Sequence, residues 1–189
     1  AGRKTQDLGT LKFLVSRRAD LHARMTRGFE LAREDRRPRS KRFDPSACTG
    51  SLPIHHAAAQ GHVSVLKYLH QHRADLHAKT DQAHTPFFVS VLNGHLPAAE
   101  FFIHHRADVS VRAGSLDSWE PIHAAAARGS IPLLDMLLKH GADPTIKTKR
   151  GIRPIDFCED KRARHYMDSF SADSHTSQSQ TAAHEAREL

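Results

Sequence analysis

The sequence predicts an all-α repeat solenoid, a stack of helix–turn–helix units joined by short hairpin loops. The prolines that open the short first helices are spaced by 33, 35 and 33 residues. They are Pro53, Pro86, Pro121 and Pro154. An Ala-Asp pair, beginning at Ala74, Ala107 and Ala142, recurs at 33 and 35 residues. Because two independent markers share one period, we interpret the chain as an array of structural repeats.

Each predicted unit begins with a proline, which loses no hydrogen bond in the first turn of a helix. Thr85, just before Pro86, is expected to cap its helix. Glycines at positions 61, 94 and 129 are expected to end the first helices. Second helices are predicted over 63–69, 96–103 and 131–138 from apolar residues at helical spacing. A last helix is expected to begin at 154–158 and to continue as a charged capping helix to residue 170.

The N-terminal part fits the same array less regularly. Arg18-Ala19-Asp20 repeats the second marker, but 25–49 interrupts the period. The chain lacks an initiating Met and opens on a second helix, so we expect a fragment of a longer protein with further repeats upstream. The predicted units are 8–24 (partial repeat), 25–48 (degenerate unit with a basic insertion), 49–81, 82–116 and 117–149 (repeats), 150–170 (cap) and 171–189 (disordered polar tail).

Composition narrows the class of protein. The chain has 189 residues and a formal charge of +7, and no apolar run approaches the roughly 20 residues of a membrane span. Its two cysteines, Cys48 and Cys158, are far apart in the sequence. This spacing argues against a disulfide framework and predicts a reducing, intracellular compartment, either the cytoplasm or the nucleus.

The repeated residues resemble those of the ankyrin-repeat family. The resemblance rests on Pro53-Ile54-His55, Thr85-Pro86, Pro121-Ile122-His123 and the run Leu137–Asp143, and it covers about residues 8–158. Leu52, Glu120 and Arg153 depart from the family's Thr, and Phe88 and Asp156 depart from its His. Arginine at positions 18, 73 and 106 replaces a helix-ending Gly, so strained or altered turns are expected there.

The resemblance implies that a partner meets the hairpin tips and the outward side of the first helices. The corresponding residues are Ser51, Gln60, Lys79, Asp81, Gln82, His84, Asn93, Arg112, Asp117, Trp119, Arg128, Lys147, Lys149 and Arg150, with Ala59, Leu92 and Ile152 beside them. Trp119 is the expected hot spot, because it is the only Trp and Trp is enriched among such residues. The alternative is that its ring folds back over the neighbouring two-residue insertion.

Sixteen histidines suggest a metal site, but nine occupy recurring repeat positions. Equivalent positions in stacked helices lie roughly 10 Å apart, whereas zinc ligands converge at about 2 Å from one ion. We therefore predict no metal and no cofactor. Cys158 has acidic neighbours that would raise its pKa, and no phosphate-binding glycine motif is present. We predict neither catalysis nor a small-molecule substrate.

The basic insertion consists of Arg33, Arg36, Arg37, Arg39, Lys41 and Arg42. It is consistent with a nuclear-import signal, a phosphate-binding patch, a docking site for an acidic partner, or simply a solvated linker. Ser40 lies among these bases, and its phosphorylation would lower the local positive charge.

The function predicted from these observations is a non-catalytic protein–protein interaction scaffold or adaptor that binds through the concave surface of the solenoid. One alternative is a basic module that binds nucleic acid or another polyanion. A second is the regulatory or targeting region of a larger enzyme or channel. The identity of the partner protein is not encoded in any motif.

Overall fold

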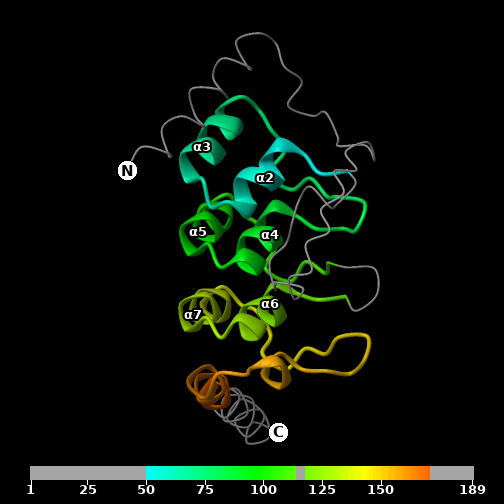
Figure 1. Ribbon diagram of the computed structural model, residues 1–189, viewed down its shortest axis with the longest axis vertical. Coiled ribbons are helices and arrows are strands. Elements are labelled where there is room, and N and C mark those ends of the chain that lie inside the picture. The colour runs from blue at the N-terminus through cyan, green and yellow to red at the C-terminus, as the bar shows by residue number, and fades with distance from the viewer. Residues whose placement is uncertain (1–49, 114–117, 171–189) are drawn as a thin grey trace, which may run out of the picture.

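The computed structural model describes residues 50–113 and 118–170, and there the helices follow one another in pairs (Figure 1). The pairs are α2 (Pro53–Ala59) with α3 (Val63–Gln71), α4 (Pro86–Asn93) with α5 (Leu96–His104), and α6 (Pro121–Arg128) with α7 (Ile131–Lys139). A 3-10 helix, η2 (Pro154–Phe157), and a helical segment over 161–170 follow. The predicted all-α repeat solenoid is confirmed.

The unit boundaries given above stay predictions. Units 8–24 and 25–48 and the tail 171–189 lie outside the described residues. Extended pairing within the described part of the chain is limited to an isolated antiparallel bridge between Ala113 and Trp119. No helix among the described residues is long and apolar enough to cross a membrane.

The helices form two rows. Figure 1 shows α2, α4, α6 and η2 stacked as an inner row and α3, α5 and α7 stacked beside them as an outer row, with the hairpins projecting from the inner row on the side away from the outer helices. This arrangement places the described parts of the hairpins on one side of the stack (Figure 1).

The inner and outer rows contribute apolar side chains of different sizes to the core. The inner helices contribute alanines that are 0% exposed, among them Ala58 and Ala125, and their lack of bulk lets neighbouring helices approach closely. The outer helices contribute Leu66, Leu69 and Leu134, also 0% exposed. One unit alone could not cover these side chains, so the stability of each repeat depends on its neighbours.

Side chains at the starts of the inner helices accept hydrogen bonds from backbone N–H groups that have no partner within the helix. Thr85 caps α4 as predicted, because its Oγ1 accepts a hydrogen bond from the Phe88 N–H at 3.2 Å. In α2, Nδ1 of His55 accepts from the Leu52 N–H at 3.1 Å. In α6, Nδ1 of His123 accepts from the Glu120 N–H at 3.1 Å. Each of these three inner helices therefore satisfies one N-terminal donor with a side chain.

Replacing Thr85 with alanine is expected to destabilise the protein by about 1 kcal/mol, because the Phe88 N–H loses its acceptor in a buried position. Thr85→Ser keeps the hydroxyl and is the matched control. Urea unfolding followed by circular dichroism measures both. Equal destabilisation by the two variants would show that the methyl group, rather than the cap, is what matters.

The helix ends adopt the left-handed backbone conformation. Gly94 and Gly129, at the C-caps of α4 and α6, have φ of 82° and 66°. Arg73 and Arg106 have φ of 62° and 63° in the turns after α3 and α5. A residue with a Cβ is disfavoured there, so the turns predicted to be strained do adopt the unfavourable conformation. Arg18 lies outside the described residues.

A side chain from the next repeat covers each helix-ending glycine. His95 lies over Gly61 and donates from Nε2 to the carbonyl oxygen of Ala59 at 2.9 Å. A Cβ atom at Gly61 would lie 2.6 Å from Nδ1 of His95. In the next interface, Arg128 lies over Gly94, where a Cβ atom would lie 2.6 Å from its Nη2. We call these contacts the glycine clasps.

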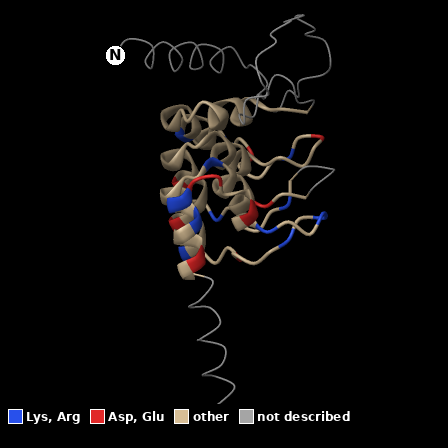
Figure 2. Cartoon of the chain, turned by 60° about the horizontal axis from the view of Figure 1, so that its bottom comes forward, with Lys and Arg blue, Asp and Glu red and all other residues tan. Residues whose placement is uncertain are grey.

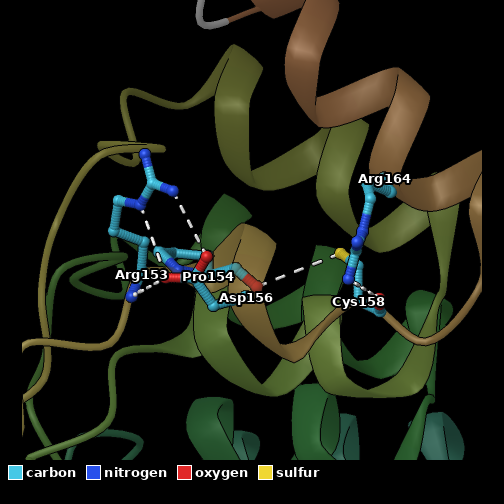
Figure 3. A network of polar contacts seen from close by, with 5 residues as sticks. All are labelled: Arg153, Pro154, Asp156, Cys158 and Arg164. Carbon is cyan, nitrogen blue, oxygen red and sulfur yellow. Dashed lines mark hydrogen bonds and ion pairs between the residues drawn. The ribbon is translucent and has the colours of Figure 1, made fainter.

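The C-terminal end differs from the continuous last helix that was expected. Residues 154–157 form only the short 3-10 helix η2, and the capping helix starts afterwards and covers 161–170. Arg164 joins the two parts, because its Nη2 donates to the carbonyl oxygen of Cys158 at 2.9 Å (Figure 3). Ala163 and Met167 on the capping helix are 0% exposed, so this helix closes the apolar end of the stack.

Candidate functional site

The base of each hairpin is fixed by an aspartate turn. Oδ1 of Asp75 accepts a hydrogen bond from the His77 N–H at 2.8 Å. The same contact recurs one repeat later at Asp108 and again at Asp143, where the Thr145 N–H donates at 2.7 Å. The recurring Ala-Asp marker thus has a structural role: Asp satisfies the backbone where the chain leaves the outer helix.

His55 holds the first hairpin against the inner row. Its Nε2 donates to the carbonyl oxygens of Ala78 and His84, both at 3.1 Å. The side chain is 0% exposed, and burial lowers its pKa. The ring is therefore neutral at pH 7, with Nδ1 as acceptor and Nε2 as donor. It has the structural role that its position in the repeat suggests.

The hairpin tips are tight turns. The Thr80 N–H donates to the His84 carbonyl oxygen at 3.1 Å, and the Thr148 N–H donates to the Ile152 carbonyl oxygen at 2.9 Å. Both threonines are buried. Within the described residues, the hairpin residues flanking them are exposed: Lys79, Asp81, Gln82, Lys147, Lys149 and Arg150. We call these six residues the hairpin face.

The charge of the hairpin face changes along the stack. The tip after α3 carries Lys79 and Asp81, which balance each other, whereas the tip after α7 carries Lys147, Lys149 and Arg150. Figure 2 shows basic residues in these loops. A surface of this kind suits a partner that is acidic at one end and mixed in charge at the other.

Several residues expected to meet a partner are held by the fold instead. Ser51 and Asn93 are 0% and 6% exposed, so neither side chain is offered at the surface. Half-buried Arg128 donates from Nη1 to the Leu92 carbonyl oxygen at 3.0 Å and belongs to a glycine clasp. Half-buried His84 stacks on Phe88 with ring centres 5.4 Å apart.

Trp119 packs toward the next unit. Its ring centre lies 4.7 Å from that of Phe157 in η2, and the residue is half-buried. Its backbone pairs with Ala113 on both sides, at 2.7 and 2.8 Å. Trp119 therefore contributes to the contact between the third described repeat and the cap, a role that neither sequence interpretation included.

Arg112 is also engaged within the fold. Its Nε lies 3.2 Å from Oε1 of Glu120, whose side chain is 6% exposed. Burial raises the pKa of Glu120, and the hydrogen bond from Arg112 opposes this rise. The guanidinium of Arg112 thus has a partner inside the fold, although the side chain is largely exposed.

Of the remaining predicted residues, one is exposed and the others lie outside the described part of the chain. Gln60 is exposed at the end of α2. Asp117, the basic insertion (Arg33, Arg36, Arg37, Arg39, Lys41 and Arg42), Cys48 and Ser40 lie outside the described residues.

Cys158 is a buried thiol, 2% exposed, beside the carbonyl oxygen of Pro154. Its pKa is raised, as the sequence indicated, but the main cause is burial, with Asp160 and Asp168 adding to it and Arg164 opposing it. A thiol with a raised pKa is a poor nucleophile.

The sequence did not predict the polar network that closes the stack. Oδ2 of Asp156 accepts from the Arg153 N–H at 2.9 Å, and Arg153 Nη2 lies 3.3 Å from Oδ1 of the same carboxylate (Figure 3). Asp156 thereby performs in η2 the capping role that His55 and His123 perform in α2 and α6. The spacing of three residues between Arg153 and Asp156 was a signal that could have revealed it.

Among the described residues, no three His, Cys, Asp or Glu side chains are arranged to hold a metal ion. Two imidazoles do meet on the outer row: the ring centres of His70 and His105 lie 4.3 Å apart. The sequence argument compared equivalent repeat positions, such as His72 and His105, and so overlooked this diagonal pair.

Comparison with known proteins agrees with the geometry. The family described as "Ankyrin repeats (3 copies)" matches residues 4–113 and 54–148. Ankyrin repeat and SOCS box protein 9 of Mus musculus is 33% identical over 105 residues, which are 55% of this chain and 35% of that protein. Alpha-latrocrustotoxin-Lt1a of Latrodectus tredecimguttatus is 30% identical over 112 residues, 59% of this chain and 8% of the toxin.

Palmitoyltransferase ZDHHC13 of Homo sapiens is 36% identical over 66 residues, 35% of this chain and 10% of that protein. The chain thus spans between 8% and 35% of the length of these three relatives. Ankyrin repeats generally mediate protein–protein interaction and are generally non-catalytic. Since the family match extends over well more than half of the sequence, the chain belongs to the ankyrin-repeat family.

Proposed function

We propose that the chain is a non-catalytic interaction scaffold or adaptor that binds another protein through the hairpin face. The observation that carries the proposal is that buried and exposed residues of the hairpins have different roles. Buried residues such as His55 and Thr80 fix each hairpin in place, while the long charged side chains beside them are exposed. A rigid support with an exposed polar tip is what a recognition surface requires.

The proposal includes no cofactor, metal-dependent reaction or small-molecule substrate. We also propose an intracellular location, which the free, buried thiol of Cys158 supports. The resemblance implied a larger concave binding surface, and we propose only the hairpin face as the binding site. Ser51 and Asn93 are left out because they are buried, and Arg128 because it bonds to the backbone within the fold.

A charge-reversal pair tests this assignment. Lys79→Glu with Lys147→Glu changes the hairpin face, whereas Lys67→Glu with Lys161→Glu makes the same change in net charge on α3 and on the capping helix. All four lysines are exposed. Proteins captured from nuclease-treated cell extract by the unmodified chain are expected to fall at least about tenfold in recovery with the first pair, because rim charges change association, and to remain with the second.

Two results would contradict the proposal. Equal loss with both pairs would mean that net charge alone drives capture. Unchanged capture with the hairpin pair would mean that binding takes place elsewhere.

The basic tip also supports the alternative of a polyanion-binding module. Lys147, Lys149 and Arg150 lie within four consecutive residues and are all exposed. Binding of double-stranded DNA, measured by filter retention at two salt concentrations, separates the two functions, because phosphate contacts weaken steeply with salt. Retention that is lost at the higher salt and with the hairpin pair favours the alternative.

The alternative of a targeting region in a larger enzyme has one observation in its favour. A palmitoyltransferase is among the relatives, and the chain spans only 10% of its length. The hairpin-face test does not depend on which larger protein surrounds the array.

A further inference from the structure

A groove separates the outer helices α3 and α5 on the side away from the hairpin face. Its volume is about 400 Å³, and His70, Glu100, Phe101, His104 and His105 are among its lining residues. The function proposed above makes no use of this groove.

The two histidines in contact come from consecutive repeats. His70 lies in the last turn of α3, and His105 is the C-cap of α5. Their ring centres are 4.3 Å apart and the ring planes are inclined by 50°. Phe101 packs beside His105, with ring centres 4.6 Å apart, and so limits the positions that the His105 ring can adopt.

This separation suits coordination of one ion by both rings. A metal–nitrogen bond to imidazole is about 2.0–2.1 Å, and the ring centre lies about 1 Å behind the nitrogen, so two rings on one tetrahedral ion have centres roughly 5 Å apart. A small rotation of either side chain would reach that value from the observed separation. Parallel stacked rings, by contrast, would not direct their nitrogens toward a common point.

We propose that His70 and His105 form a two-histidine site for a divalent ion of the zinc, nickel and copper class, bridging α3 and α5. Imidazole nitrogen is a preferred ligand of these ions. Water completes the coordination, since within 50–113 and 118–170 no third His, Cys, Asp or Glu side chain converges with the pair. Of the charged groups in the groove, the Glu100 carboxylate favours a cation and the Lys67 ammonium opposes it.

The bound ion would stabilise the interface between two neighbouring repeats. Repeat arrays are held together by interfaces between neighbours, and an ion bound only when α3 and α5 are docked adds to one such interface. Ligation also requires neutral imidazoles, so binding should weaken as the pH falls. The site is independent of the hairpin face and can fail without affecting the proposed function.

The test compares histidines that occupy related positions. The sequence holds 16 histidines, so weak binding elsewhere must be separated from the pair. His70→Ala and His105→Ala remove the site. His140→Ala is the matched control, because His140 occupies in α7 the C-cap position that His105 occupies in α5. Since His70 is exposed and His105 half-buried, the substitutions leave the core intact.

Zinc chloride, titrated into the full chain with calorimetric detection, is expected to reveal one site that weakens at least about tenfold in each of the two variants and is unchanged in His140→Ala. Copper(II) bound to the unmodified chain is expected to show coupling to imidazole nitrogens from two rings in its paramagnetic resonance spectrum. Equal zinc binding by all four proteins, no binding by any, or coupling to one ring only would overturn the site and leave the pair as an aromatic contact.

Discussion

The protein is expected to lose stability steeply as the pH falls from 6.5 toward about 4. Burial lowers the pKa of His55 and of His123, both 0% exposed, below the ordinary value of 6.5. Burial, with the charge of His55 adding to it, lowers the pKa of His84 to about 4. In this pH range the unfolded chain therefore binds protons that the folded chain does not.

The sign follows from that difference. Stability rises with pH wherever the unfolded state binds more protons, so the stabilisation from neutral histidines is complete above pH 6.5 and decreases as the pH falls through the unfolded value. Each fully buried histidine contributes up to about 1.4 kcal/mol per pH unit across its window. For His84, whose folded pKa is about 4, this window covers the range from pH 6.5 down to about 4.

Glu120 opposes this loss, because burial raises its pKa above 4.5 and the folded chain takes up that proton more readily than the unfolded chain. The aspartates act at lower pH. A hydrogen bond from Ser110 lowers the pKa of Asp108, and one from Arg153 lowers that of Asp156, both from an ordinary value of 3.8. Their contributions are present above that value and are lost below it. Loss of stability between pH 6.5 and about 4 can therefore be assigned to histidine.

Urea unfolding at a series of pH values between about 4 and 7.5 measures the effect. His84→Phe keeps a ring against Phe88 but removes one titrating group, so its curve should be flatter than that of the unmodified chain. His77→Gln, at an exposed position, should leave the slope unchanged. A free energy of unfolding that stays constant across this range would refute the prediction.

Replacing Leu134 with alanine is expected to destabilise the protein by about 2–5 kcal/mol, through lost transfer energy and the cavity left behind. Leu134 is 0% exposed in α7, where the outer row meets the inner row. Because each repeat relies on its neighbours, the effect should include weaker coupling of the cap to the rest of the stack.

Leu138→Ala in the same helix is the matched control, because Leu138 is only half-buried and loses less contact. Denaturant titrations of the two variants, followed by circular dichroism, give the comparison. If Leu138→Ala proves as costly as Leu134→Ala, burial depth is not what determines the stability of this helix.

The repeat architecture could be predicted because its determinants are local. Pro86 with Thr85 before it, and Gly94 and Gly129 at helix ends, constrain the backbone within a few residues, so their recurrence showed where the helix pairs lie. Asp156 did not match the family's His at the helix start, yet its carboxylate accepts the same N-cap hydrogen bond. The hydrogen bond to the N-cap N–H is therefore present, although the residue type differs from the family pattern.

The candidate site was harder to predict, because it depends on which side of the stack a residue faces. Equivalent repeat positions suggested that Ser51 and Asn93 face a partner, but packing between repeats buries both. The His70 and His105 pair joins positions that are not equivalent, and only the offset between neighbouring outer helices brings them together. Periodicity aligns equivalent positions, so it did not reveal a contact between two positions that are not equivalent.

The glycine clasps bear on how such an array can be rearranged. His95 and Gly61, like Arg128 and Gly94, form a matched pair divided between two repeats. Shuffling whole repeats into a new order would separate each partner from its counterpart and could set a bulky residue against another one. Recombination would therefore keep each pair intact only where the two repeats that share it stay together on one fragment.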